Sequence, residues 1–117
     1  HEMEPGIRRG WHGRDSVLVL HPVSKEEPAA IEAVLDVPAS AKQLVLLVAS
    51  DKRGDFVLRV SLNGEPAHES VIDTKGEWRE IGVDLAPHAG KTVRARVENA
   101  ANDWSFEAAY IASIEFR

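Results

Sequence analysis

Short apolar runs recur along this chain about every 10 to 13 residues, separated by Gly, Pro, Asn and Asp. Such spacing is typical of an all-β sandwich or barrel built from short strands. The one segment of helical composition, residues 26–34, contains Pro28, so a helix there would be short. We therefore predict an all-β fold, an antiparallel β-sandwich or jelly roll of about eight strands. The strands are expected at residues 16–21, 30–37, 43–50, 56–63, 67–73, 79–85, 92–99 and 108–116.

Alternation of apolar and polar residues predicts which side of each strand is buried. Residues 44–49 are apolar on both sides, which predicts a central strand whose outer side is covered, with the chain ends as candidate covers. Asn63-Gly64 predicts a tight hairpin, because both residues tolerate a positive φ. In the last strand we expect the core side to consist of Tyr110, Ala112, Ile114 and Phe116.

Length and charge limit the organisation and the partners of the chain. Its 117 residues fit one domain, which we divide into a lead-in, residues 1–10, and a single sandwich domain, residues 11–117. The net charge of -5, with no long Lys/Arg run, predicts no nucleic-acid partner. The longest apolar run is far shorter than the roughly 20 residues of a spanning helix, so no membrane span is expected. The absence of Cys suits a bacterial product better than a small animal ectodomain.

No motif for catalysis is evident, and we predict that the domain is not an enzyme. The five histidines are scattered without metal-binding spacing, which favours surface or packing roles over ligation. The tripeptide Arg53-Gly54-Asp55 matches a cell-adhesion sequence, but Gly and Asp also simply punctuate a turn before a strand. Asp51 and Asp55, with carbonyl groups of the same loop, are candidate calcium ligands.

Six residues are candidates for ligand binding, and each has a structural alternative. Trp11, Trp78 and Trp104 fall at strand ends or in loops, where an indole either stacks on a sugar ring or caps the core. Trp78 is in phase with the outward Glu80 and Asp84. Arg59, Arg94 and Arg96 point outward and form either a polar cluster that binds hydroxyls or carboxylates, or a solvated face balanced by Glu98.

The second half of the chain carries a recognisable series of segments: residues 78–85, Ala89-Gly90-Lys91 with Val93, Asn102-Asp103-Trp104, and residues 107–116. It resembles the galactose-binding-domain-like superfamily, in which a Trp opens a strand that ends in Asp-Leu and a Trp-containing loop leads into the last strand. The resemblance covers residues 55–116 and implies a sandwich of the carbohydrate-binding-module type. Ile111 departs from the pattern, because related sequences often carry an aromatic residue there.

The resemblance implies a non-catalytic carbohydrate-binding module of a larger extracellular bacterial protein. Glycan and neighbouring domains of a parent protein are then the expected partners, and the expected location is secreted, periplasmic or in the cell envelope. It also implies a structural calcium held by Glu107 with Asp51 or Asp55. The alternative is a structural or protein-docking sandwich without a glycan ligand.

Overall fold

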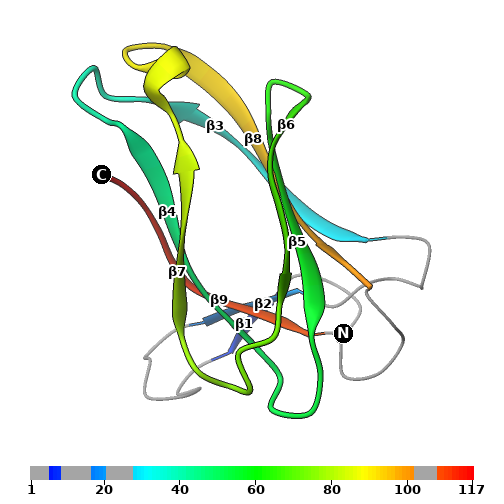
Figure 1. Ribbon diagram of the computed structural model, residues 1–117. Coiled ribbons are helices and arrows are strands. Elements are labelled where there is room, and N and C mark those ends of the chain that lie inside the picture. The colour runs from blue at the N-terminus through cyan, green and yellow to red at the C-terminus, as the bar shows by residue number, and fades with distance from the viewer. Residues whose placement is uncertain (1–5, 9–16, 21–27, 102–107) are drawn as a thin grey trace.

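Two antiparallel β-sheets form a sandwich in the computed structural model, which describes residues 6–8, 17–20, 28–101 and 108–117 (Figure 1). The predicted all-β fold is confirmed, and the helical content of the described part is one three-residue 3-10 turn, Ala86–His88. The strands are β1 (Gly6–Arg8), β2 (Val17–Leu20), β3 (Ala29–Asp36), β4 (Gln43–Ser50), β5 (Phe56–Leu62), β6 (Glu65–Ile72), β7 (Arg79–Asp84), β8 (Thr92–Ala100) and β9 (Ala109–Phe116).

The strand order explains the sequence pattern. One sheet has the order β1-β2-β9-β4-β7 and the other the order β3-β8-β5-β6. The doubly apolar β4 is central, between β9 and β7, as its composition predicted. The predicted lead-in contributes strand β1, whose three residues pair with β2.

The hairpin between β5 and β6 forms at the predicted turn. Asn63 and Gly64 have φ values of 53° and 81°, and Leu62 pairs with Glu65 across the turn. The Asn63 carboxamide oxygen also accepts a hydrogen bond of 2.9 Å from the backbone N–H of Arg94. The turn is thereby fixed to the neighbouring strand β8.

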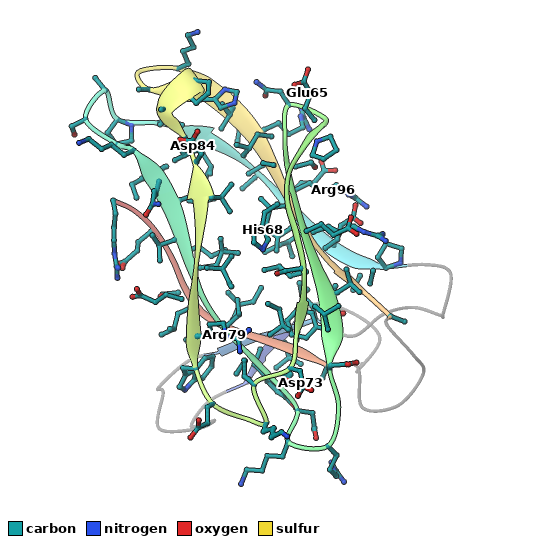
Figure 2. The ribbon with its side chains drawn as sticks, in the orientation of Figure 1. Glu65, His68, Asp73, Arg79, Asp84 and Arg96 are labelled. Atoms are coloured by element: carbon teal, nitrogen blue, oxygen red, sulfur yellow. The ribbon has the colours of Figure 1, made fainter. Side chains whose placement is uncertain are left out.

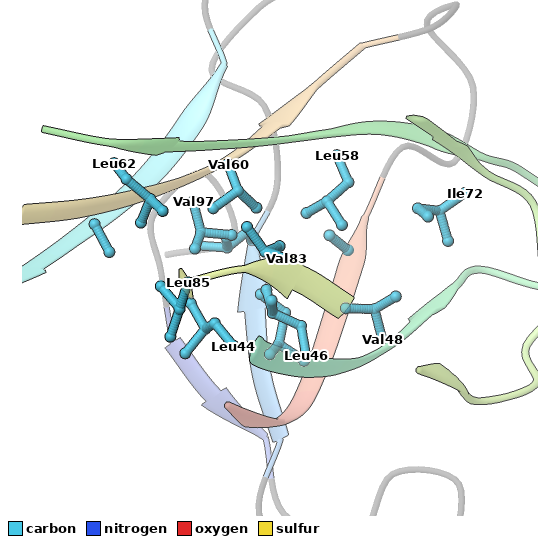
Figure 3. Packing of buried hydrophobic residues seen from close by; sticks show 14 of the residues in the cluster. Leu44, Leu46, Val48, Leu58, Val60, Leu62, Ile72, Val83, Leu85 and Val97 are labelled. Atoms are coloured by element: carbon cyan, nitrogen blue, oxygen red, sulfur yellow. The ribbon is translucent and has the colours of Figure 1, made fainter. Parts of the chain in front are cut away.

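The core lies between the two sheets (Figure 3). Alternate side chains of β4, which include Leu46 at 0% exposure, pack toward alternate side chains of β5 and β8. The alternating apolar residues of β5 (Phe56, Leu58, Val60 and Leu62) and of β8 (Val93, Ala95 and Val97) are all buried. Labelled members of this cluster in Figure 3 are Leu44, Leu46, Val48, Leu58, Val60, Leu62, Ile72, Val83, Leu85 and Val97.

The predicted facing of β9 is wrong at its start. Tyr110 joins a second cluster, with Ala49, separate from the core between the sheets, whereas Ile111 belongs to that core. A bulge causes the change of phase: Val48 pairs with Ile111 but Leu47 pairs with Ser113, so one extra residue is inserted into β9.

Beyond the bulge, Ile114 and Phe116 pair with the inward Leu46 and Leu44 and so share their side of the sheet, as predicted. They are nevertheless 40% and 36% exposed. In the described part of the chain β2 pairs only with residues 109–111 of β9. The second half of β9 therefore forms an edge of the sheet there. The core is therefore less covered along this flank.

Candidate functional site

The connection between β6 and β7 places Trp78 at the start of β7. Glu77 donates a backbone hydrogen bond of 3.0 Å to the carbonyl of Thr74, which closes a four-residue turn. Its two central residues, Lys75 and Gly76, have φ values of 54° and 85°. Both values are left-handed, a conformation that Gly adopts freely and Lys rarely, so the turn is tight.

Hydrogen bonds join this turn to the end of β4. The hydroxyl oxygen of Ser50 accepts a hydrogen bond of 2.9 Å from the backbone N–H of Thr74, and the Thr74 hydroxyl oxygen accepts one of 3.0 Å from the N–H of Ser50. Ser50 is fully buried. Because these bonds connect residues 24 positions apart, they hold the loop against the five-stranded sheet.

Trp78 lies at the edge of a hollow with a volume of about 260 Å³. The indole is half-buried, since it packs against the cluster of Ala49 and Tyr110 on the outer side of the five-stranded sheet. Asp73 and Arg79 are labelled in Figure 2 and lie at the same end of the sandwich. The other side chains that line this hollow, called here the Trp78 hollow, are Thr74, Lys75 and Glu77.

The Trp78 hollow combines two kinds of contact. The supported indole offers an apolar ring, and two acidic and two basic side chains surround it with hydrogen-bond acceptors and donors. Sequence reasoning identified Trp78 but missed its neighbours Asp73, Lys75, Glu77 and Arg79. The sequence feature that could have indicated these neighbours is the Lys75-Gly76 pair, which forms a turn immediately before Trp78.

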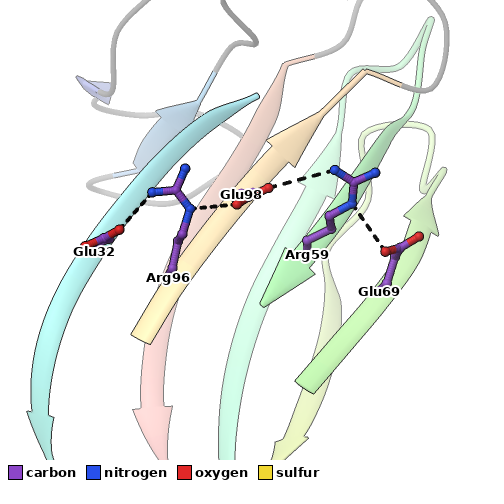
Figure 4. A network of polar contacts seen from close by, with 5 residues as sticks. All are labelled: Glu32, Arg59, Glu69, Arg96 and Glu98. Atoms are coloured by element: carbon purple, nitrogen blue, oxygen red, sulfur yellow. Dashed lines mark hydrogen bonds and ion pairs between the residues drawn. The ribbon is translucent and has the colours of Figure 1, made fainter. Parts of the chain in front are cut away.

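The predicted arginines lie elsewhere, on the outer side of the four-stranded sheet (Figure 4). Arg96 binds Glu98 at 2.6 Å and Glu32 at 2.8 Å, while Arg59 binds Glu69 at 3.3 Å and lies 3.9 Å from Glu98. These five residues form a ladder of alternating charge across all four strands, called here the Arg–Glu ladder.

Hydrogen bonds within the ladder shift the pKa values of two of its members, Glu32 and Arg96. A hydrogen bond from Arg96 lowers the pKa of Glu32 below its ordinary value, and hydrogen bonds to Glu98 and Glu32 raise the pKa of Arg96. Arg94 also approaches Glu32, at 3.5 Å. The three arginines therefore lie together with carboxylates that include Glu98, on the sheet opposite to the one that carries Trp78.

Of the predicted calcium ligands, Asp51 and Asp55 lie in the loop between β4 and β5. One carboxylate oxygen of Asp51 accepts hydrogen bonds from the backbone and side chain of Arg53, at 2.9 and 3.2 Å. Across residues 6–8, 17–20, 28–101 and 108–117, no three or more His, Cys, Asp or Glu residues gather in a metal-binding arrangement. Calcium prefers six to eight oxygen ligands. Glu107 lies outside the described residues.

Two further candidates, Trp11 and Trp104, also lie outside the described residues. The tripeptide Arg53-Gly54-Asp55 forms part of the β4–β5 turn, and one carboxylate oxygen of Asp55 is buried. Asp55 as a whole is half-buried, and Gly54 and Asp55 lie between the turn and the start of β5, as the structural interpretation of the tripeptide predicts. In the part of the chain that the structure covers, no helix has the length and apolar character needed to cross a membrane.

Comparison with known proteins gives no family assignment: the chain matches no family model and none of the curated proteins.

Proposed function

We propose that this chain is a non-catalytic carbohydrate-binding module that binds a pyranose ring at the Trp78 hollow. The observation that carries the proposal is the half-buried indole beside four charged side chains. A pyranose ring has an apolar face that gains by covering an aromatic ring, and hydroxyl groups that must recover the hydrogen bonds they lose to water. The Trp78 hollow supplies both kinds of contact.

The support beneath the indole favours binding rather than packing alone. The Trp78 side chain packs against Ala49 and Tyr110 and also lines the hollow. The turn is held by the Ser50 and Thr74 hydrogen bonds, so little conformational freedom remains to be lost on binding. A side chain that is fixed before the ligand arrives is an effective anchor.

In this proposal the module belongs to a larger secreted or cell-envelope protein of a bacterium and brings a neighbouring domain to a glycan. A structural calcium, with Asp51, Asp55 and Glu107 as ligands, stays a prediction. It is tested by comparing the melting temperature in millimolar calcium and in chelator. An unchanged melting temperature removes it.

A glycan array identifies the ligand, and titration of Trp78→Ala tests the site. Loss of the largest apolar contact should weaken binding by about 1 to 3 kcal/mol, which corresponds to about 5- to 150-fold. Trp78→Phe is the matched control, because it keeps an aromatic ring and should lose less. A Trp78→Ala variant that is folded and binds like the parent contradicts the assignment of the site.

A protein-docking domain is the second candidate, because the exposed Ile114 and Phe116 leave apolar surface along the flank between the sheets. The same experiments separate the two functions. If the array yields no ligand and Trp78→Ala unfolds the domain, then the indole serves the fold and the docking function is favoured.

A further inference from the structure

A second hollow lies on the outer side of the four-stranded sheet, with a volume of about 340 Å³. Ser61 of β5 pairs with Arg96 of β8 on one side and with Pro66 of β6 on the other. Because directly paired residues share a face, a short side chain stands here between two larger ones. This depression, called here the Ser61 hollow, also has Arg59, Glu69 and Glu98 in its wall.

The wall of the Ser61 hollow alternates donors and acceptors. Within the described chain, the hydrogen bond of Arg59 to protein is the one from Nε to Glu69, and the distance of 3.9 Å to Glu98 is too long for another. A guanidinium carries five N–H donors in a planar fork, so Arg59 keeps donors for a ligand. Glu69 is 65% exposed and offers acceptors beside it.

The charges of this wall cancel, since Arg59 and Arg96 stand against Glu69 and Glu98. An anionic ligand would meet two carboxylates, and a cationic ligand two guanidinium groups. A neutral hydroxyl avoids both repulsions and can accept from a guanidinium while it donates to a carboxylate. Two neighbouring hydroxyl oxygens can each accept a hydrogen bond from the planar guanidinium of one arginine.

We propose that the Ser61 hollow is a separate binding site for a neutral polyol with vicinal hydroxyl groups. It goes beyond the function proposed above, because it uses neither Trp78 nor the β6–β7 loop and lies on the other sheet. No Trp, Tyr or Phe is among the residues that line the site, and its one ring is the imidazole of His68, so its affinity rests chiefly on hydrogen bonds that replace those made with water. We expect a dissociation constant on the order of millimolar.

The test is a ¹H–¹⁵N NMR titration of the full chain with myo-inositol, which has vicinal hydroxyls, and with cyclohexanol, which has one hydroxyl. Myo-inositol should shift the backbone amides of Arg59, Ser61 and Arg96, and cyclohexanol should not. Ser61→Leu fills the hollow and should weaken binding at least about tenfold, as should Arg59→Gln, which removes the charged donors. Val71→Leu is the matched control, because Val71 is an exposed residue of β6 that does not line the hollow.

Each other outcome has a defined meaning. Absence of shifts around Ser61 overturns this proposal, and a glycan bound at Trp78 then still supports the function proposed above. Tighter binding of glucuronate than of myo-inositol overturns the neutral ligand class. Loss of the Ser61 shifts in folded Trp78→Ala overturns the independence of the two sites, whereas their persistence supports it even if Trp78 binds nothing.

Discussion

The outer sides of the two sheets differ, although both belong to one small sandwich. On the five-stranded sheet, Ala49 and Tyr110 are buried and Trp78 packs against them. On the four-stranded sheet, the Arg–Glu ladder lies partly in solvent, and Arg59 is 47% exposed. An outward position in a strand is therefore not by itself a surface position, because the neighbouring strands decide what covers it.

A polar bridge adds to this cover on the five-stranded sheet. The Arg117 guanidinium donates to Glu80 of β7 at 2.8 and 3.1 Å and to Glu115 of β9 at 2.6 Å. Since β4 lies between β7 and β9, the bridge spans the central strand. Val45, which pairs with Glu115, is 4% exposed. On the outer side of the central strand, Val45 and Ala49 are therefore buried and Leu47 is half-buried.

The largest loss of folding stability is expected from Tyr110→Ala. Removal of a buried aromatic ring from the outer cluster should lower the free energy of unfolding by about 3 to 5 kcal/mol. Val34→Ala is the control, because Val34 is an exposed apolar residue, at 63%, and its loss should change stability by less than about 0.5 kcal/mol. Urea denaturation measures both values. Equal losses would show that the two outer sides are equally exposed in solution.

A smaller loss is expected from Ser50→Ala. The variant leaves the backbone N–H of Thr74 without its acceptor, which should cost about 1 to 3 kcal/mol and loosen the turn before Trp78. Thr74→Ser keeps the hydroxyl and is the matched control. Thermal melting measures stability, and hydrogen exchange at Thr74 reports the turn. Unchanged exchange at this amide in Ser50→Ala would show that the turn does not depend on the Ser50 hydroxyl.

The Arg–Glu ladder should contribute less. Glu98→Gln removes the charge that lies between Arg96 and Arg59, and we expect a loss below about 1 kcal/mol, because these partly exposed ion pairs are screened by water. The loss should shrink further in 1 M salt, where the Debye length is about 3 Å. Denaturation at low and high salt measures it. A loss above 2 kcal/mol at both salt concentrations contradicts a solvated ladder.

The smallest effect concerns pH. The pKa of Glu32 is lower in the folded chain than in the unfolded chain, chiefly because Arg96 donates a hydrogen bond to it. The contribution to stability is therefore present above about pH 4, the unfolded pKa of a Glu, and is lost as the pH falls through the folded pKa. Carboxyl-carbon NMR should show the pKa of Glu32 rising toward its ordinary value in Arg96→Gln. An unchanged pKa of Glu32 in this variant would show that Arg96 is not the cause of its lowered value.

Regular features of this fold were predictable from the sequence because they are local. Alternation in β5 and β8 gave the buried faces, and Asn63-Gly64 gave the turn, since φ preferences act within a few residues. The bulge in β9 was not predictable, because it depends on the pairing with β4 and on no residue type in β9 itself.

The candidate sites show the same limit. Trp78 could be identified by type, but its hollow depends on a turn that is held by Ser50, 24 residues before Thr74. Likewise, the outward phase of Arg59 and Arg96 was evident, whereas their carboxylate partners come from β3 and β6 through strand pairing. Contacts between strands that are distant in sequence decide which polar groups meet.

The central claim is that Trp78 contacts a glycan directly, and the most direct measurement is the NMR signal of its indole N–H. The chain has three Trp residues, so Trp78→Phe assigns this signal. During titration with the glycan selected by the array, we predict that the Trp78 indole signal shifts in a saturable manner, together with the amides of Lys75 and Glu77. Saturable binding that leaves these three signals unmoved would contradict the account.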